Sequence, residues 1–118
     1  MKILITVRKN WVAPRFDLTS EVVIALCEDQ HILGNPRTIL MTRPSAEELC
    51  ALIIKEGINT VICGGIEERH LQYLAWKKIR IIDSVVGPYA EALKAAIAGF
   101  LQSGTILPGA KQGALNHE

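Results

Sequence analysis

The sequence lacks an excess of charge of either sign, since 13 basic residues are balanced by 12 acidic ones for a formal net charge of +1. Binding to nucleic acid or to an anionic membrane normally depends on a strongly basic surface. We therefore expect neither nucleic acid nor membrane as a partner. Any affinity for an anion has to come from a local cluster of cations.

Long apolar runs and cysteine motifs are missing as well. No uninterrupted apolar segment reaches the roughly 18 residues of a membrane-spanning helix. The opening MKILITVRKN has neither the long apolar region nor the small-residue cleavage site of a signal peptide. The three cysteines, Cys27, Cys50 and Cys63, are far apart and form no CxxC motif. These absences predict a cytoplasmic protein with reduced thiols rather than a disulfide scaffold.

The sequence signatures of common enzymes are also absent. There is no GxGxxG or Walker-type lysine motif for a nucleotide, and no Ser-His-Asp or Cys-His pattern stands out. Residues 2–7 carry no carboxylate, whereas a nuclease of the ribonuclease H type begins its metal site on the first strand. We therefore expect a protein that is not an enzyme. An enzyme acting on a small anionic metabolite is the least favoured interpretation; a binding protein and an interaction module are both favoured over it.

The sequence does contain enough apolar material for one core, with 118 residues of which 49% are hydrophobic. We expect a single domain over residues 1–101. Residues 102–118 are rich in glycine and polar residues, which predicts a flexible C-terminal tail.

Apolar and β-branched runs predict strands, and apolar residues at helical spacing predict helices. The predicted strands are 2–7, 21–28, 37–42, 58–63 and 79–83, and the predicted helices run from Ser45 to Gly57, over 67–78 and over 87–100. The second and third strands form a hairpin with its turn at Gly34-Asn35-Pro36, and the later strands pair in parallel through right-handed crossovers. The pattern predicts an α/β protein with a mixed sheet, helices on its faces and the first strand near its centre.

The stretch TVICGGIEERH, residues 60–70, holds the first candidate site. Its glycines follow a buried strand and precede a helix, which is where open α/β sheets bind ligands. Cys63 could offer its thiol to a soft metal there, while Glu67 and Glu68 disfavour a phosphate. On the residues alone, a plain strand-to-helix turn remains slightly favoured over a binding role. His70 borders the apolar face of the helix, where a structural histidine is the more common outcome.

The loop RKNWVAPRFD, residues 8–17, is the second candidate. Arg8, Lys9 and Arg15 concentrate positive charge after the first strand. Trp11 and Phe16 could cover a ligand, or they could pin the loop to the domain while the cations face water. If the first and fourth strands are parallel neighbours, this loop emerges beside Cys63.

Four stretches, MKILITV, VAPRFDLTSEVVIAL, ALIIKEGINTVICGGIEERHLQYLAWKKIRII and GPYAEALKAAIAG, together resemble the dinitrogenase iron-molybdenum cofactor biosynthesis family. This family includes NifX, NafY and the C-terminal part of NifB. The resemblance covers about residues 1–100, and its most specific pieces are PRFD and VICGGI. It implies a ribonuclease H-like, three-layer fold without nuclease activity, in which a five-stranded mixed sheet of order 3-2-1-4-5 carries helices on both faces.

The resemblance also implies a function connected with nitrogen fixation. A NifX-like protein would bind or carry an anionic iron-sulfur or iron-molybdenum type cluster without enzymatic activity, with cofactor-assembly proteins as partners. In this chain Arg15 would supply charge, Gly64 and Gly65 would allow close approach, and Cys63 or His70 would ligate the metal. The alternative is a protein-interaction or regulatory module of the same fold that no longer binds a cluster, with a homodimer left open.

Overall fold

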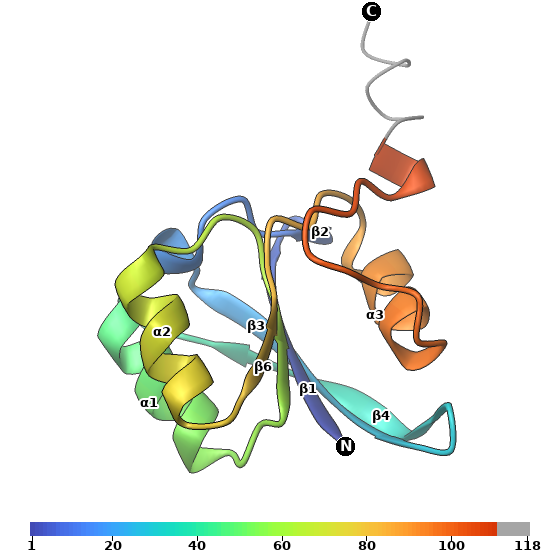
Figure 1. The fold of residues 1–118 in the computed structure, drawn as a ribbon, viewed down its shortest axis with the longest axis horizontal. Helices are drawn as coiled ribbons and strands as arrows, with labels where there is room; N and C mark the ends of the chain where they lie inside the picture. Colours follow the sequence, from blue (N-terminus) through green and yellow to red (C-terminus); the bar gives the residue numbers. More distant parts are fainter. Residues whose placement is uncertain (111–118) are drawn as a thin grey trace, which may run out of the picture.

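A mixed β-sheet with β1 at its centre organises the chain, which the computed structural model describes over residues 1–110 (Figure 1). The strands are β1 (Lys2–Arg8), β2 (Trp11–Val12), β3 (Glu21–Glu28), β4 (His31–Leu40), β5 (Thr60–Ile62) and β6 (Arg80–Ile82). They lie in the order β4-β3-β1-β5-β6, and the short β2 pairs with β1 off this path. β1 is antiparallel to β3 and parallel to β5, which in turn is parallel to β6. The central position predicted for the first strand is confirmed.

The sheet has six strands rather than the five that the resemblance implied, and the unexpected one is β2. Lys9 and Asn10 adopt φ values of 51° and 67°, so the chain turns back at once and β2 pairs with the end of β1. When β2 is left out, the remaining strands, counted along the chain, stand in the order third, second, first, fourth, fifth. The missed strand therefore adds a short hairpin to the end of β1.

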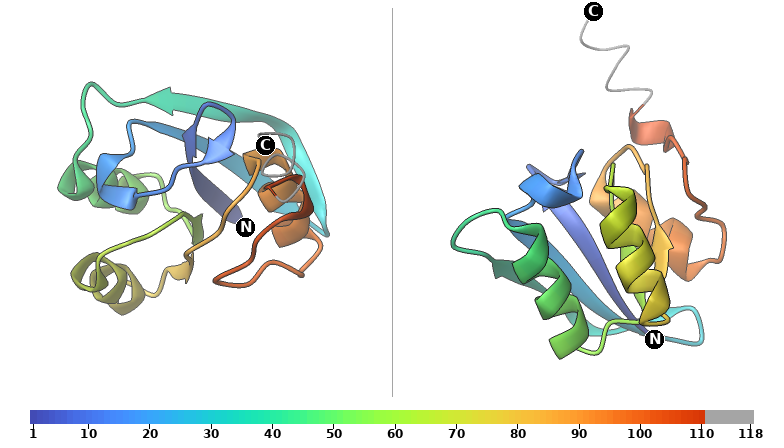
Figure 2. Two further views of the ribbon diagram at one scale, coloured as in Figure 1. Left: turned by 90° about the horizontal axis from the view of Figure 1, so that it is seen from above. Right: turned by 60° about the vertical axis from the view of Figure 1, so that its left-hand side comes forward.

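Helices cover both faces of the sheet and complete three layers (Figures 1 and 2). The helices are α1 (Ala46–Lys55), α2 (Glu68–Trp76) and α3 (Tyr89–Ile97), with a short 3-10 turn, η1 (Phe16–Leu18), before β3. Successive side chains of β1 point to opposite faces. Ile3 and Ile5 therefore pack in the cluster under α3, while Leu4 packs in the cluster under α1 and α2. The mixed sheet with helices on both faces is confirmed.

Local sequence signals set the helix boundaries. The Ser45 side chain accepts a hydrogen bond of 3.2 Å from the Glu48 amide at the start of α1, as its N-cap position predicts. Gly57 follows α1 with φ of 66°, the left-handed conformation that glycine adopts most easily. Within residues 1–110 no helix combines the length and the apolar character needed to cross a membrane.

The turn of the β3–β4 hairpin was predicted in the wrong place. Asp29 and Gln30 form the turn with φ values of 50° and 66°, and β4 already begins at His31. This conformation matches the twist of a two-residue hairpin, although glycine or asparagine is the usual choice. Gly34-Asn35-Pro36 lies inside β4, where the register shifts opposite the segment between Ile24 and Leu26. Proline is tolerated there because β4 is an edge strand.

Residues 102–110, which belong to the predicted flexible tail, pack against the domain in this structure. The Leu107 amide donates to Val86 O at 2.9 Å, and the Val86 amide donates to Thr105 O at 3.0 Å. Leu101 and Leu107 are buried in the cluster under α3. Apolar residues spaced along a polar segment therefore anchor it beside the segment that follows β6. The rest of the predicted tail, residues 111–118, lies outside the described residues.

Candidate functional site

The two candidate segments of the sequence lie side by side at the carboxyl ends of β1 and β5. The Gly65 amide donates to Pro14 O at 2.7 Å, and the Phe16 amide donates back to Gly65 O at 2.8 Å. Arg15 and Gly65 thus form a parallel bridge that extends the pairing of the two strands. The predicted adjacency of the cationic loop and the Cys63-Gly64-Gly65 turn is confirmed.

Gly64 is required by the packing of these two segments. An added Cβ atom would lie 2.5 Å from Pro14 O and 2.7 Å from the Pro14 carbonyl carbon, and closer still to Ala13 O. All three are backbone atoms, which cannot swing aside as a flexible side chain could. The same construction at Gly65 meets Pro14 O at 3.4 Å, an ordinary contact. A glycine at position 64 therefore allows the Ala13-Pro14 segment to pack closely, and this packing explains the glycine without a ligand.

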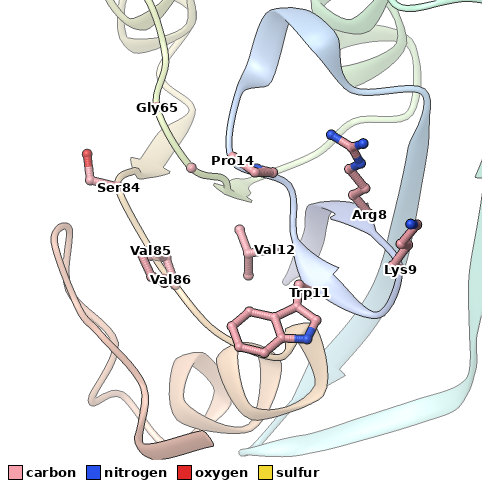
Figure 3. Close-up of a pocket in the computed structure, with 10 residues that line it drawn as sticks. Arg8, Lys9, Trp11, Val12, Pro14, Gly65, Ser84, Val85 and Val86 are labelled. Atoms are coloured by element: carbon pink, nitrogen blue, oxygen red, sulfur yellow. The ribbon is translucent and has the colours of Figure 1, made fainter. Parts of the chain in front are cut away.

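A cleft of about 660 Å³ opens beside this junction (Figure 3). Its lining comes from the β1–β2 hairpin and Pro14, from Gly64 and Gly65, and from Ser84, Val85 and Val86 after β6. β1, β5 and β6 run in parallel, so their carboxyl ends meet at this edge of the sheet. The cleft therefore occupies the place where ligands bind in open α/β sheets.

The electrostatics of the cleft are one-sided. Arg8 and Lys9 line it, and among the residues that the structure describes no carboxylate does. Trp11 faces the cleft with Val12 and Val86 around it, as Figure 3 shows. The β1–β2 hairpin is joined to the segment after β6 by a hydrogen bond of 2.9 Å from the Val12 amide to Gly87 O. The site thus combines an apolar wall with a cationic rim.

Arg15 contributes less free charge than predicted. Its guanidinium donates two hydrogen bonds to Asp17, at 3.0 Å from Nε and 2.6 Å from Nη2. Arg15 lines a separate cavity of about 440 Å³, which it shares with Arg8 and Pro14. Phe16 is buried and pins the loop to the core, whereas Trp11 remains at the cleft. Of the two roles considered for these aromatic residues, Phe16 therefore anchors the loop and Trp11 is placed to cover a ligand.

The prediction that Cys63 offers its thiol to the cleft does not agree with the structure. Its side chain is fully buried in the cluster under α1 and α2. Burial, with a smaller contribution from Asp83, raises the pKa of the thiol to about 12. The reason is strand parity, since Ile62 points toward α3 and Cys63 therefore points the other way. A neutral, enclosed thiol is not a metal ligand in this conformation.

His70 is also buried and lies apart from the cleft. Its ring centroid is 6.0 Å from that of Phe16, and within residues 1–110 its Nε2 has no hydrogen-bond partner. It borders a cavity of about 370 Å³ that Glu47 and Cys50 also line. The described part of the chain holds no group of three histidine, cysteine or acidic side chains placed to hold a metal ion.

The wall formed by Ser84, Val85 and Val86 was not predicted as part of the site. The Ser84 amide donates to Gly64 O at 2.9 Å, which ties this wall to the glycine turn. Ser84 adopts φ of 57°, a conformation uncommon for residues other than glycine. The sequence contained a signal for this wall. β6 was predicted to run parallel to β5, so the residues after β6 had to lie at the same edge of the sheet as the glycine turn.

The fold and the cleft define the class of this protein as a small three-layer α/β domain with an apolar, cation-bordered cleft at the carboxyl ends of its parallel strands. Sequence comparison identifies the kind of domain. The chain belongs to the dinitrogenase iron-molybdenum cofactor family, whose sequence model matches residues 1–99. The family resemblance is thereby confirmed. No curated protein matches the sequence.

Solved structures share the fold. The crystal structure of PH0822 superposes with a TM-score of 0.79 at 22% identity, covering 87% of this chain and 94% of that one. MJ0327 of Methanocaldococcus jannaschii, provisionally named a dinitrogenase, has a TM-score of 0.71 at 22% identity, covering 86% and 92%. TM1290 of Thermotoga, provisionally named a NifB protein of the DUF35 family, has a TM-score of 0.67 at 18% identity, covering 90% and 96%. At these identities the likeness concerns the fold alone.

Proposed function

We propose that the cleft beside Gly64 binds an anionic iron-sulfur or iron-molybdenum type cluster, or a precursor of one, and that the chain carries it without transforming it. The observation that supports this most directly is the electrostatics of the cleft, where Arg8 and Lys9 border a mainly apolar surface and, among the described residues, no carboxylate lines it. Membership of a family named for the iron-molybdenum cofactor supports the choice of cargo. The partners would be the proteins that load the cluster and receive it.

The physical basis of binding is charge attraction beside an apolar wall. Metal-sulfide clusters carry net negative charge, which favours a rim of cations without competing carboxylates. Two unit charges 4 Å apart attract by about 1 kcal/mol in water and by about 4 kcal/mol at the effective dielectric of a protein surface. A cargo that covers Trp11 and Val86 displaces water from one side of the rim and moves its attraction toward the larger value.

The residues first predicted for the site take different parts in this proposal. Gly64 and Gly65 shape the cleft, and Arg15 stands at the neighbouring cavity with its charge shared by Asp17. Cys63 has no part in it because its thiol is enclosed. His70 makes no direct contact with the cargo in this conformation, since it borders a different cavity. We also propose that the three layers are of the ribonuclease H-like type, without nuclease activity.

The test is cluster retention under anaerobic conditions. Purified protein is mixed with a pre-formed iron-sulfur cluster, or with isolated iron-molybdenum cofactor, and passed through gel filtration while iron, molybdenum and visible absorption are measured. We expect co-elution with the wild type and at least tenfold weaker retention by the double variant Arg8→Glu/Lys9→Glu. Arg43→Glu/Lys94→Glu is the matched control, because it makes the same charge change at exposed positions outside the cleft.

Two outcomes would contradict the proposal. If the wild type retains no more metal than the Arg8→Glu/Lys9→Glu variant, the cleft does not hold the cargo, and the interaction module becomes the better interpretation. If Cys63→Ser abolishes retention in a protein that still folds, the cluster is held by a ligand in the core instead. Circular dichroism of each variant separates loss of binding from loss of fold.

A further inference from the structure

The last turn of α2 exposes a pair of aromatic side chains. Trp76 is 73% exposed and Tyr73 is 43% exposed, with their ring centroids 6.4 Å apart. The Lys77 ammonium lies 4.8 Å from the centre of the Trp76 ring and 5.8 Å from that of Tyr73. Tryptophan, tyrosine and arginine are the residues most enriched among those that dominate binding at protein interfaces. Two neighbouring exposed rings form a contiguous apolar patch, which is more typical of an interaction site than a single exposed ring.

The charged residues next to these rings along the chain are of one sign. Lys77, Lys78 and Arg80 are all exposed, and no acidic residue occurs between positions 69 and 82. Within residues 1–110, none of the ion pairs involves any of these three cations. The surface thus has the charge that complements a partner rich in carboxylates.

Lys78 is held in a conformation that glycine would adopt more easily. Its φ is 65°, at the position directly after the C-cap of α2. The Ile79 amide donates to Leu74 O at 3.0 Å and the Lys78 amide to Ala75 O at 2.9 Å, the pattern that usually ends on glycine. A side chain in this conformation costs roughly 1 kcal/mol relative to glycine. Lysine at position 78 is therefore less favourable for the local backbone than glycine would be.

This surface lies away from the cleft. α2 begins just after the carboxyl end of β5 and ends just before β6 begins, so its last turn stands near the amino ends of both strands (Figures 1 and 2). The nine residues of the helix span about 13 Å along its axis. A partner bound at the last turn leaves the cleft open.

We propose that Tyr73, Trp76, Lys77, Lys78 and Arg80 form a docking surface for a protein partner that presents carboxylates around an exposed apolar side chain. The carboxylates pair with the three cations, and the apolar side chain packs against Trp76. A protein segment suits this surface better than single-stranded RNA. Lys77 lies over one face of each ring, which reduces the flat area on which successive bases would stack, whereas a single aliphatic side chain needs only the part of Trp76 that stays exposed. This docking function is independent of the cargo proposed for the cleft.

The test uses a labelled synthetic peptide in which aspartates and glutamates flank a leucine, with fluorescence anisotropy as the measurement. Two further probes are the same peptide with asparagine and glutamine in place of the acids, and labelled oligouridine. We expect the acidic peptide to bind the wild type most tightly and its affinity to fall at least tenfold in Trp76→Ala and in Lys77→Glu/Arg80→Glu. Arg43→Glu/Lys94→Glu, with the same charge change elsewhere, should bind nearly as well as the wild type.

Lys78→Gly distinguishes docking from a structural role. This change removes a charge and relieves the left-handed backbone, so we expect weaker peptide binding together with a higher melting temperature. Unchanged peptide affinity in Lys78→Gly and Trp76→Ala, equal binding of the amide peptide, or tighter binding of oligouridine would each overturn the proposal. Cluster retention by Trp76→Ala, measured separately, reports on the cleft alone.

Discussion

Replacing Gly64 with alanine is the sharpest test of how the site is built. The new Cβ atom would stand 2.5 Å from Pro14 O, whereas such contacts below 3.0 Å are essentially never seen. The loop that carries Ala13 and Pro14 must therefore move by about 0.5 Å or more. Such a shift strains the two hydrogen bonds that join this loop to Gly65.

The expected loss of stability follows from these contacts. Overpacking against atoms that cannot move aside costs about 1–3 kcal/mol, and weakening two hydrogen bonds adds up to about 1 kcal/mol for each. We expect Gly64→Ala to lower the free energy of unfolding by roughly 2–4 kcal/mol on these grounds. For a domain of this size that corresponds to a fall in melting temperature of roughly 8–16 °C.

The assay is urea unfolding followed by circular dichroism, with thermal melting as a second measurement. Gly65→Ala is the matched control, because its added Cβ meets Pro14 O at 3.4 Å and no strained φ is involved. We expect this control to lose less than about 1 kcal/mol. A Gly64→Ala protein as stable as Gly65→Ala would refute the packing argument. If it also retained no cluster, the glycine would be there to admit cargo rather than the loop.

Three further predictions concern other parts of the structure. Burial raises the pKa of Cys63 to about 12, above its value in the unfolded chain, so its contribution to stability is complete below about pH 9 and is lost as the pH rises toward 12. Iodoacetamide should accordingly modify Cys63 only after unfolding, and rapid modification of the folded protein, followed by mass spectrometry, would contradict its enclosure. Leu107→Ala should cost about 2–4 kcal/mol in urea unfolding because the side chain is buried, whereas a flexible tail would show no change. Gln30→Gly should raise the urea midpoint, by up to about 1 kcal/mol in stability, because φ at this position is 66°, and a lower midpoint would exclude this turn.

The features predicted correctly from the sequence depend on interactions within a few residues along the chain. Ser45 begins a helix because its side chain can accept from a backbone amide three residues later, whatever the rest of the chain does. The apolar run of β1 predicts burial on both faces, and the short connections between β5, α2 and β6 predict parallel strands. The hairpin turn at Asp29-Gln30 escaped prediction because neither residue is a glycine, although both adopt a positive φ. β2 was missed at Lys9-Asn10 although Asn10 is a common residue in such turns, because the strand is only two residues long.

The sequence by itself determined the class of fold and the sheet edge at which the candidate site lies, because these follow from periodicity, caps and the parallel crossover. The family was indicated separately, by the resemblance of stretches such as PRFD and VICGGI to known members. Only the tertiary structure decided which side chains face the cleft. A strand that is apolar on both faces gives no sign of its orientation, so the turn of Cys63 into the core could not be read from TVIC. The need for Gly64 likewise comes from Ala13 and Pro14, some fifty residues earlier in the chain. Such contacts exist only once distant segments have packed together, which is why the cationic rim at Arg8 and Lys9, rather than the thiol, emerged as the candidate binding group.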